Sequence, residues 1–175
     1  MQILAISGSL RRSSLNTALL RAATLLAPSE VHVVLYSDLG ELPHFNPDLE
    51  DDEPPVVSDF RAQIRASAGL LISSPEYAHG VPGVLKNALD WLVGGNEFIG
   101  KPVALFNASP RSTYAQASLT EILTVMSGRI VTEASITLPL LDKHLDEHGI
   151  VANPEFANVV RVAIAAFVRA IEATQ

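Results

Sequence analysis

The N-terminal stretch Ile3-Leu4-Ala5-Ile6-Ser7-Gly8-Ser9-Leu10-Arg11-Arg12-Ser13-Ser14-Leu15-Asn16 joins a short apolar run to an amphipathic segment that continues to Ala27. The apolar run predicts a buried strand, and the periodic segment after it predicts a helix at about Asn16–Ala27. A strand that leads directly into a helix is the repeating unit of parallel α/β sheets. This stretch therefore favours the α/β class.

The turn between this strand and this helix has the composition of an anion-binding site. The first amides of a helix point outward without partners, and the helix dipole is positive there. Hydroxyl groups and a guanidinium can complete a cage around a phosphate. The candidate residues are Ser9, Arg11, Ser13, Ser14 and Asn16. One serine would suffice to cap the helix, so the cluster favours a phosphate site over simple capping.

Four further apolar runs alternate with helical segments along the chain. The runs are Val31–Leu35, Leu70–Ile72, Val103–Phe106 and a weaker one at Ile130–Ile136, and the expected helices are about Val56–Ser67, Pro82–Val93, Thr113–Gly128 and Pro154–Ala173. Apolar runs without period-two alternation are typical of parallel strands covered on both faces. We expect a doubly wound α/β fold with right-handed crossovers, in a single domain that spans residues 1–175.

Composition limits the classes of function. The 175 residues are 48% hydrophobic and 18% charged, which is enough for one substantial core. No apolar run approaches the roughly 18 residues that span a bilayer, and the chain starts without a signal-peptide pattern, so we expect a cytoplasmic protein. The net charge of -7 argues against nucleic-acid and membrane partners. Without cysteine, any redox chemistry requires a bound cofactor.

Two more polar loops follow strands at the edge where ligands bind in such sheets. The loop Ser73–Gly83 combines prolines and glycines with Glu76, Tyr77 and His79, which suits a planar polar ligand, although a Pro/Gly-rich turn in which Tyr77 only packs is the alternative. The third loop is Ala108–Thr113. By contrast, Ser37–Pro55, with four prolines and an acidic run, predicts a long solvated connection.

Two other patterns are expected to carry no chemistry. Gly95–Lys101 matches the first seven positions of a phosphate-binding P-loop, but Pro102 follows and the segment precedes a strand, so Lys101 is expected to face solvent. His144 and His148 are four residues apart with acidic neighbours, as in some metal sites. The surrounding sequence is typical of a surface connection, so we expect solvated side chains and no metal.

The chain resembles the NADPH-dependent FMN reductase family, the flavodoxin-like group that includes quinone and chromate reductases. The resemblance rests on Gly8-Ser9-Leu10-Arg11 with Ser14 and Asn16, on Ser74-Pro75-Glu76-Tyr77 followed by Val81–Trp91, and more weakly on Leu42-Pro43 with Phe45–Leu49. It implies a five-stranded parallel sheet of order 2-1-3-4-5, bound FMN, and association into a homodimer or homotetramer.

The resemblance also implies a set of site residues. For the FMN phosphate they are Ser9, Arg11, Ser14, Leu15 and Asn16; along the ring and ribityl chain Pro75, Glu76, Tyr77, Ala78, His79 and Gly80; and near the pyrimidine end Ser109, Pro110 and Arg111. The chain departs from the family at two places. Ala78 stands where many members have Asn, and Asn107–Tyr114 lacks their Gly-Gly pair.

The implied activity is an oxidoreductase in which NADPH or NADH passes a hydride to flavin N5, and the flavin then reduces a small acceptor in ping-pong order. The acceptor class is open between quinones, flavins, azo compounds and metal oxyanions. A non-catalytic FMN carrier or redox sensor is the alternative, because fold does not prove turnover. A hydrolase using Ser9 or Ser109 is disfavoured because neither serine lies in Gly-x-Ser-x-Gly.

Overall fold

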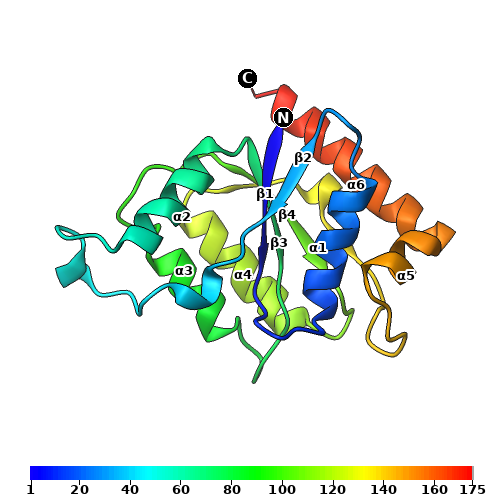
Figure 1. Cartoon of the computed structure of the whole chain (residues 1–175), viewed down its shortest axis with the longest axis horizontal. Coiled ribbons are helices and arrows are strands. Elements are labelled where there is room, and N and C mark those ends of the chain that lie inside the picture. Colours follow the sequence, from blue (N-terminus) through cyan, green and yellow to red (C-terminus); the bar gives the residue numbers. More distant parts are fainter. Residues whose placement is uncertain (175) are drawn as a thin grey trace.

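The computed structural model describes residues 1–174 and contains one parallel sheet between two layers of helices (Figure 1). Its strands are β1 (Gln2–Ser7), β2 (His32–Leu35), β3 (Gly69–Ser73), β4 (Pro102–Asn107), β5 (Arg129–Ile130) and β6 (Ile136–Thr137). The order is β2-β1-β3-β4-β5, with β6 also paired to β4, and every pair is parallel. The predicted order 2-1-3-4-5 is confirmed.

The helices divide between the two faces of the sheet (Figure 1). On one face lie α1 (Leu15–Leu26), α5 (Glu147–Ala152) and α6 (Pro154–Glu172); on the other lie α2 (Pro55–Ala66), α3 (Gly83–Asp90) and α4 (Thr113–Val125). Three short 3-10 helices are η1 (Leu39–Glu41), η2 (Pro47–Leu49) and η3 (Thr132–Ala134). Within residues 1–174, the helices are all too short or too polar to cross a membrane.

Alternate side chains of the central strands enter two separate cores. In β1, Ile3 and Ala5 pack with α1 and α6, whereas Leu4 and Ile6 pack with α2 and α3. All four are essentially inaccessible to solvent. Burial on both faces explains why the strand reads as a continuous apolar run, because neither set of side chains meets water.

The predicted strand over Ile130–Ile136 is wrong in its middle, where η3 separates the short strands β5 and β6. Ser135 occupies the gap. Its Oγ accepts a hydrogen bond from the Leu105 amide at 3.0 Å and donates to the Val131 carbonyl, also at 3.0 Å. A side chain thus replaces a strand-to-strand hydrogen bond, so the edge of the sheet stays satisfied although the strand is broken.

The region expected to be a surface connection after the fifth strand contains the helix α5 instead. Asp146 caps it, because its side chain accepts a hydrogen bond from the Gly149 amide at 2.8 Å. Ile150 is fully buried in the core that α1 and α6 share. The helix packs against α1 and so brings the segment before it to the carboxyl edge of the sheet.

The long loop after β2 is anchored to α3 over its first half. The Asn87 side chain accepts a hydrogen bond from the Phe45 amide at 2.8 Å and donates to the Pro43 carbonyl at 2.9 Å. Trp91 Nε1 donates to the same carbonyl at 2.8 Å. The expectation of a solvated connection therefore holds for the exposed acidic residues 50–52 but not for Leu39 and Leu42, which are buried.

Candidate functional site

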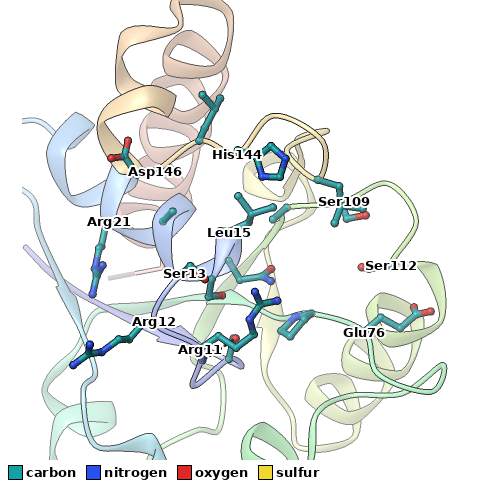
Figure 2. A pocket seen from close by; sticks show the side chains of 18 of the residues that line it. Arg11, Arg12, Ser13, Leu15, Arg21, Glu76, Ser109, Ser112, His144 and Asp146 are labelled. Atoms are coloured by element: carbon teal, nitrogen blue, oxygen red, sulfur yellow. Dashed lines mark hydrogen bonds between the residues drawn. The ribbon is translucent and has the colours of Figure 1, made fainter.

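A cleft of about 730 Å³ opens at the carboxyl ends of β1, β3 and β4 (Figure 2). The three loops that the sequence singled out meet there, as the topology of a doubly wound sheet requires. The candidate residues that line it are Ser9, Arg11, Ser14, Leu15, Asn16, Pro75, Glu76, Tyr77, Ser109 and Arg111. The remaining candidates, Ala78, His79, Gly80 and Pro110, lie outside its lining.

The start of α1 presents free hydrogen-bond donors to this cleft. Ser14 caps the helix, since its Oγ accepts a hydrogen bond from the Thr17 amide at 3.3 Å. Within residues 1–174, the amides of Leu15 and Asn16 have no protein acceptor. The first turn carries no acidic side chain, so the positive end of the helix dipole is not neutralised. Capping therefore uses one donor and leaves two for an anion.

Close packing of β1 against β3 fixes the position of this turn. The Gly8 amide donates to the Ser73 carbonyl at 2.8 Å, and a Cβ on Gly8 would lie 2.7 Å from Ser74 Oγ. Only glycine permits this approach. The Ser73 hydroxyl in turn donates to Asn16 Oδ1 at 2.9 Å, so the end of β3 holds the first turn of α1.

The loop after β3 forms a tight hairpin turn. Tyr77 and Gly80 exchange two backbone hydrogen bonds, of 3.2 and 3.0 Å. The two residues between them, Ala78 and His79, have φ of 50° and 59°, a left-handed conformation that non-glycine residues rarely adopt. Glu76 precedes the turn, and its Oε2 accepts a hydrogen bond from the Ala115 amide at 2.9 Å. This carboxylate therefore ties the hairpin to the start of α4.

A ring stack makes a second link between the same two elements. The rings of His79 and Tyr114 lie 4.2 Å apart, centroid to centroid, and are 18° from parallel. The exposed ring of Tyr77 lines the cleft, whereas His79 is not part of the lining. The two ring faces that the sequence offered thus have different surroundings: Tyr77 borders the cleft and His79 packs on α4.

The third loop is ordered by its own side chains. Asn107 Oδ1 accepts a hydrogen bond from the Ser109 amide at 3.0 Å, and Ser109 Oγ accepts one from the Arg111 amide at 3.1 Å. Arg111 lies 3.8 Å from Asp142 in an exposed ion pair. In the part of the chain that the structure describes, no histidine hydrogen-bonds the hydroxyl of Ser9 or Ser109. Neither serine has the base that a hydrolytic nucleophile needs.

Several cleft residues were not among the candidates of the sequence. They are Arg12, Ala18, Arg21, Ala108, Ser112, Leu141, His144, Leu145, Asp146 and Glu147, whereas Ser13, a candidate of the anion-binding turn, also lines the cleft. Arg12 was part of the turn after the first strand but was not singled out there. The lining residues just before and at the start of α5 had no local sequence pattern that predicts them, because they reach the cleft only through the packing of α5 on α1.

The segment that imitates a P-loop lies before β4, away from the cleft. Lys101 is partly buried there instead of facing solvent as expected, and its Nζ donates to the Ser67 carbonyl at the end of α2, at 2.8 Å. Burial lowers the pKa of Lys101, an effect that the carboxylate of Glu97 opposes. The lysine therefore caps the C-terminal end of α2.

Comparisons with known proteins agree with this geometry. The family model for NADPH-dependent FMN reductases matches residues 1–141. A probable NADPH:quinone oxidoreductase 2 of Oryza sativa subsp. japonica is 46% identical over 95 residues, which are 52% of this chain and 47% of that protein. A 2-hydroxy-1,4-benzoquinone reductase of a Burkholderia species is 34% identical over 155 residues, 85% of this chain and 84% of that protein.

A solved structure matches over nearly the whole chain. The flavoenzyme NAD(P)H:(acceptor) oxidoreductase FerB from Paracoccus denitrificans has a TM-score of 0.76 and 30% identity, with 98% of this chain and 97% of that chain covered. The chain thus spans about half the length of the rice relative but most of the Burkholderia and Paracoccus proteins.

Proposed function

Because the chain belongs to the NADPH-dependent FMN reductase family, we propose that it holds FMN in the cleft and passes electrons from NADPH or NADH to a quinone. Membership of this family supports three parts of the proposal: the reductase activity, the flavin and the nicotinamide donor. A quinone is the acceptor we favour because the rice and Burkholderia relatives are named for quinone reduction. The same proposal takes residues 1–175 as a single domain that associates into a homodimer or homotetramer.

The observation that carries the proposal is the fit between the start of α1 and a phosphate. Two free amides, the Arg11 guanidinium and the hydroxyls of Ser9 and Ser13 all border one end of the cleft. Such a donor set matches a phosphate dianion, which needs several donors and at least one positive charge. Ser14 and Asn16 support the site from within, through the cap and the link to β3.

The other two loops would hold the ring. Pro75, Glu76 and Tyr77 form one side of the cleft, and Ser109 and Arg111 form another. Ala78 carries no polar group and lies outside the lining, so its departure from the family removes no contact that this cleft would make. When bound, FMN supplies the hydride-accepting and electron-donating chemistry, so no side chain has to act as a nucleophile. The chain's part is to bind, orient and leave one ring face open.

A non-catalytic carrier or redox sensor would use the same phosphate site, and turnover separates the two. The test is the visible spectrum of protein mixed with FMN and desalted, recorded before and after NADPH is added without oxygen. A retained flavin band that bleaches, followed by recovery on adding a benzoquinone, is expected. Retention without bleaching would indicate the carrier, and loss of FMN on desalting and in a titration would contradict the proposed site.

A further inference from the structure

The cleft contains more positive charge than one flavin phosphate requires. Four arginines line it, Arg11, Arg12, Arg21 and Arg111, in a protein whose net charge is -7. Arg111 already faces Asp142. Of the four arginines, only Arg11 was assigned above to the flavin phosphate. Two guanidinium groups, those of Arg12 and Arg21, therefore remain without a ligand of their own.

These two arginines are separated from Arg11 in space. In Figure 2 the side chains of Arg12 and Arg21 extend on the same side of α1, whereas Arg11 projects toward the middle of the cleft. Within residues 1–174, Arg12 has no carboxylate within 4 Å, and Arg21 has one, Glu147, at the long distance of 3.8 Å. Their charges are therefore weakly compensated by the protein.

We propose that Arg12 and Arg21 form a second anion subsite that binds the 2′-phosphate of NADPH and so makes NADPH a better donor than NADH. This inference rests on the proposed function, because it names the donor used at the same cleft. Guanidinium groups match the geometry of phosphate oxygens and stay charged at every physiological pH. NADH has a hydroxyl at the same place and would gain little from two cations.

Glu147 opposes this binding in a predictable way. Its carboxylate, on the first residue of α5, lies 3.8 Å from Arg21 Nη1, so it would compete with a phosphate for that guanidinium. The neighbouring Asp146 is engaged in capping α5 through its bond to the Gly149 amide. The cleft wall thus holds one carboxylate, that of Glu147, that competes with the 2′-phosphate for Arg21. Removing its charge should strengthen binding, the opposite of removing the arginine.

The test is calorimetric titration of FMN-loaded protein with adenosine 2′,5′-bisphosphate and with adenosine 5′-monophosphate, which differ only in the 2′-phosphate. We expect the bisphosphate to bind the unmodified protein at least about tenfold more tightly, the scale of a charge-assisted hydrogen bond. Arg12→Ala and Arg21→Ala should each remove about tenfold of the bisphosphate affinity and leave the monophosphate unchanged. Glu147→Gln should increase the bisphosphate affinity by severalfold. Arg161→Ala, an exposed arginine on α6 outside the cleft, is the matched control.

Three results would overturn the inference. The first is equal affinity of the unmodified protein for the two nucleotides. The second is an equal loss of affinity for the bisphosphate and for the monophosphate in the arginine variants, which would assign these residues to the 5′-phosphate or pyrophosphate. The third is release of FMN from Arg12→Ala, which would place Arg12 in the flavin site. Because these measurements need no turnover, they are independent of the bleaching test, whose failure would contradict the proposed function instead.

Discussion

Arg11 is the residue on which the proposed flavin site depends most directly. It is exposed, has no carboxylate within 4 Å among residues 1–174, and lines the same cleft as the residues that carry the free amides of α1. Replacing it by alanine should weaken FMN binding by about 1.5–3 kcal/mol, the range for a hydrogen bond to a charged group. Quenching of FMN fluorescence on titration measures this, with Arg161→Ala as control. An unchanged dissociation constant would contradict the phosphate assignment.

Tyr36 is a residue whose hydroxyl costs stability. It is buried against Phe60, with ring centroids 4.9 Å apart, and its OH has no hydrogen-bond partner within the described residues. Tyr36→Phe removes this unpaired group and keeps the ring, so the free energy of unfolding at pH 7 should rise by about 1 kcal/mol. Urea denaturation followed by tryptophan fluorescence measures the change. A decrease would mean that the hydroxyl has a partner such as a bound water.

The same residue predicts a change with pH. Burial, followed by the charges of Asp59 and Asp38, raises the pKa of Tyr36 from 10.0 to about 12. Because the folded state resists deprotonation more than the unfolded state, this contribution to stability is complete below pH 10 and is lost as the pH rises through 12. The Tyr36→Phe variant has no hydroxyl to ionise at this position, so it does not lose this stability at high pH. Its advantage over the unmodified protein should therefore be larger at pH 11 than at pH 9 in the same urea experiment.

At the scale of elements, the hairpin turn after β3 is strained. Ala78 and His79 both adopt positive φ, which costs about 1 kcal/mol or more for each non-glycine residue. The stack of His79 on Tyr114 repays about 0.5–1.5 kcal/mol of this. Ala78→Gly removes the strain of a positive φ at one of the two residues and should raise the free energy of unfolding by about 1 kcal/mol.

A matched control for the turn is Ala165→Gly, at an exposed position inside α6. The same change of side chain should there lower stability by about 1 kcal/mol, because helical alanine is the better helix former. Thermal unfolding of the two variants is the measurement. Shifts of the same sign would mean that the turn is not strained.

The hydroxyl of Ser135 is expected to stabilise the edge of the sheet where the strand is broken. Ser135→Ala would leave the Leu105 amide in β4 without its acceptor, and an unpaired amide of this kind costs about 1–3 kcal/mol. Hydrogen exchange should show the Leu105 amide as less protected. Ser135→Thr, which keeps the hydroxyl, should retain most of the stability. If alanine and threonine behave alike, the hydroxyl does not support the strand.

The central strands and the three site loops were predictable, and the far wall of the cleft was not. Apolar runs such as Leu70–Ile72 are specific because burial on both faces leaves no polar position, and parallel strands place the loops after them at one edge. Helix α5, of only six residues, has too little sequence for a clear period. Arg21 and Glu147 meet only because α5 packs on α1, a long-range contact that no local pattern encodes.

At the scale of the whole molecule, one cleft has to serve both substrates of the proposed reaction. A second hollow, of about 290 Å³, lies beside β5 and β6 and is lined by neutral side chains of the Leu, Ile, Thr, Ser and Gln types. It offers no cation to the phosphates of a nicotinamide dinucleotide. The donor is therefore expected at the first cleft, where the acceptor must also approach the flavin, so the two should bind in turn.

Alternating occupancy has a kinetic signature. Initial rates measured with NADPH varied at several fixed concentrations of a benzoquinone should give parallel double-reciprocal lines, and excess quinone should inhibit competitively with NADPH. The Arg21→Ala variant should keep the parallel pattern while its KM for NADPH rises toward that for NADH, because the change affects affinity for the donor and not the sharing of the cleft. Intersecting lines would mean that donor and acceptor bind together, and would contradict the alternating use of the cleft.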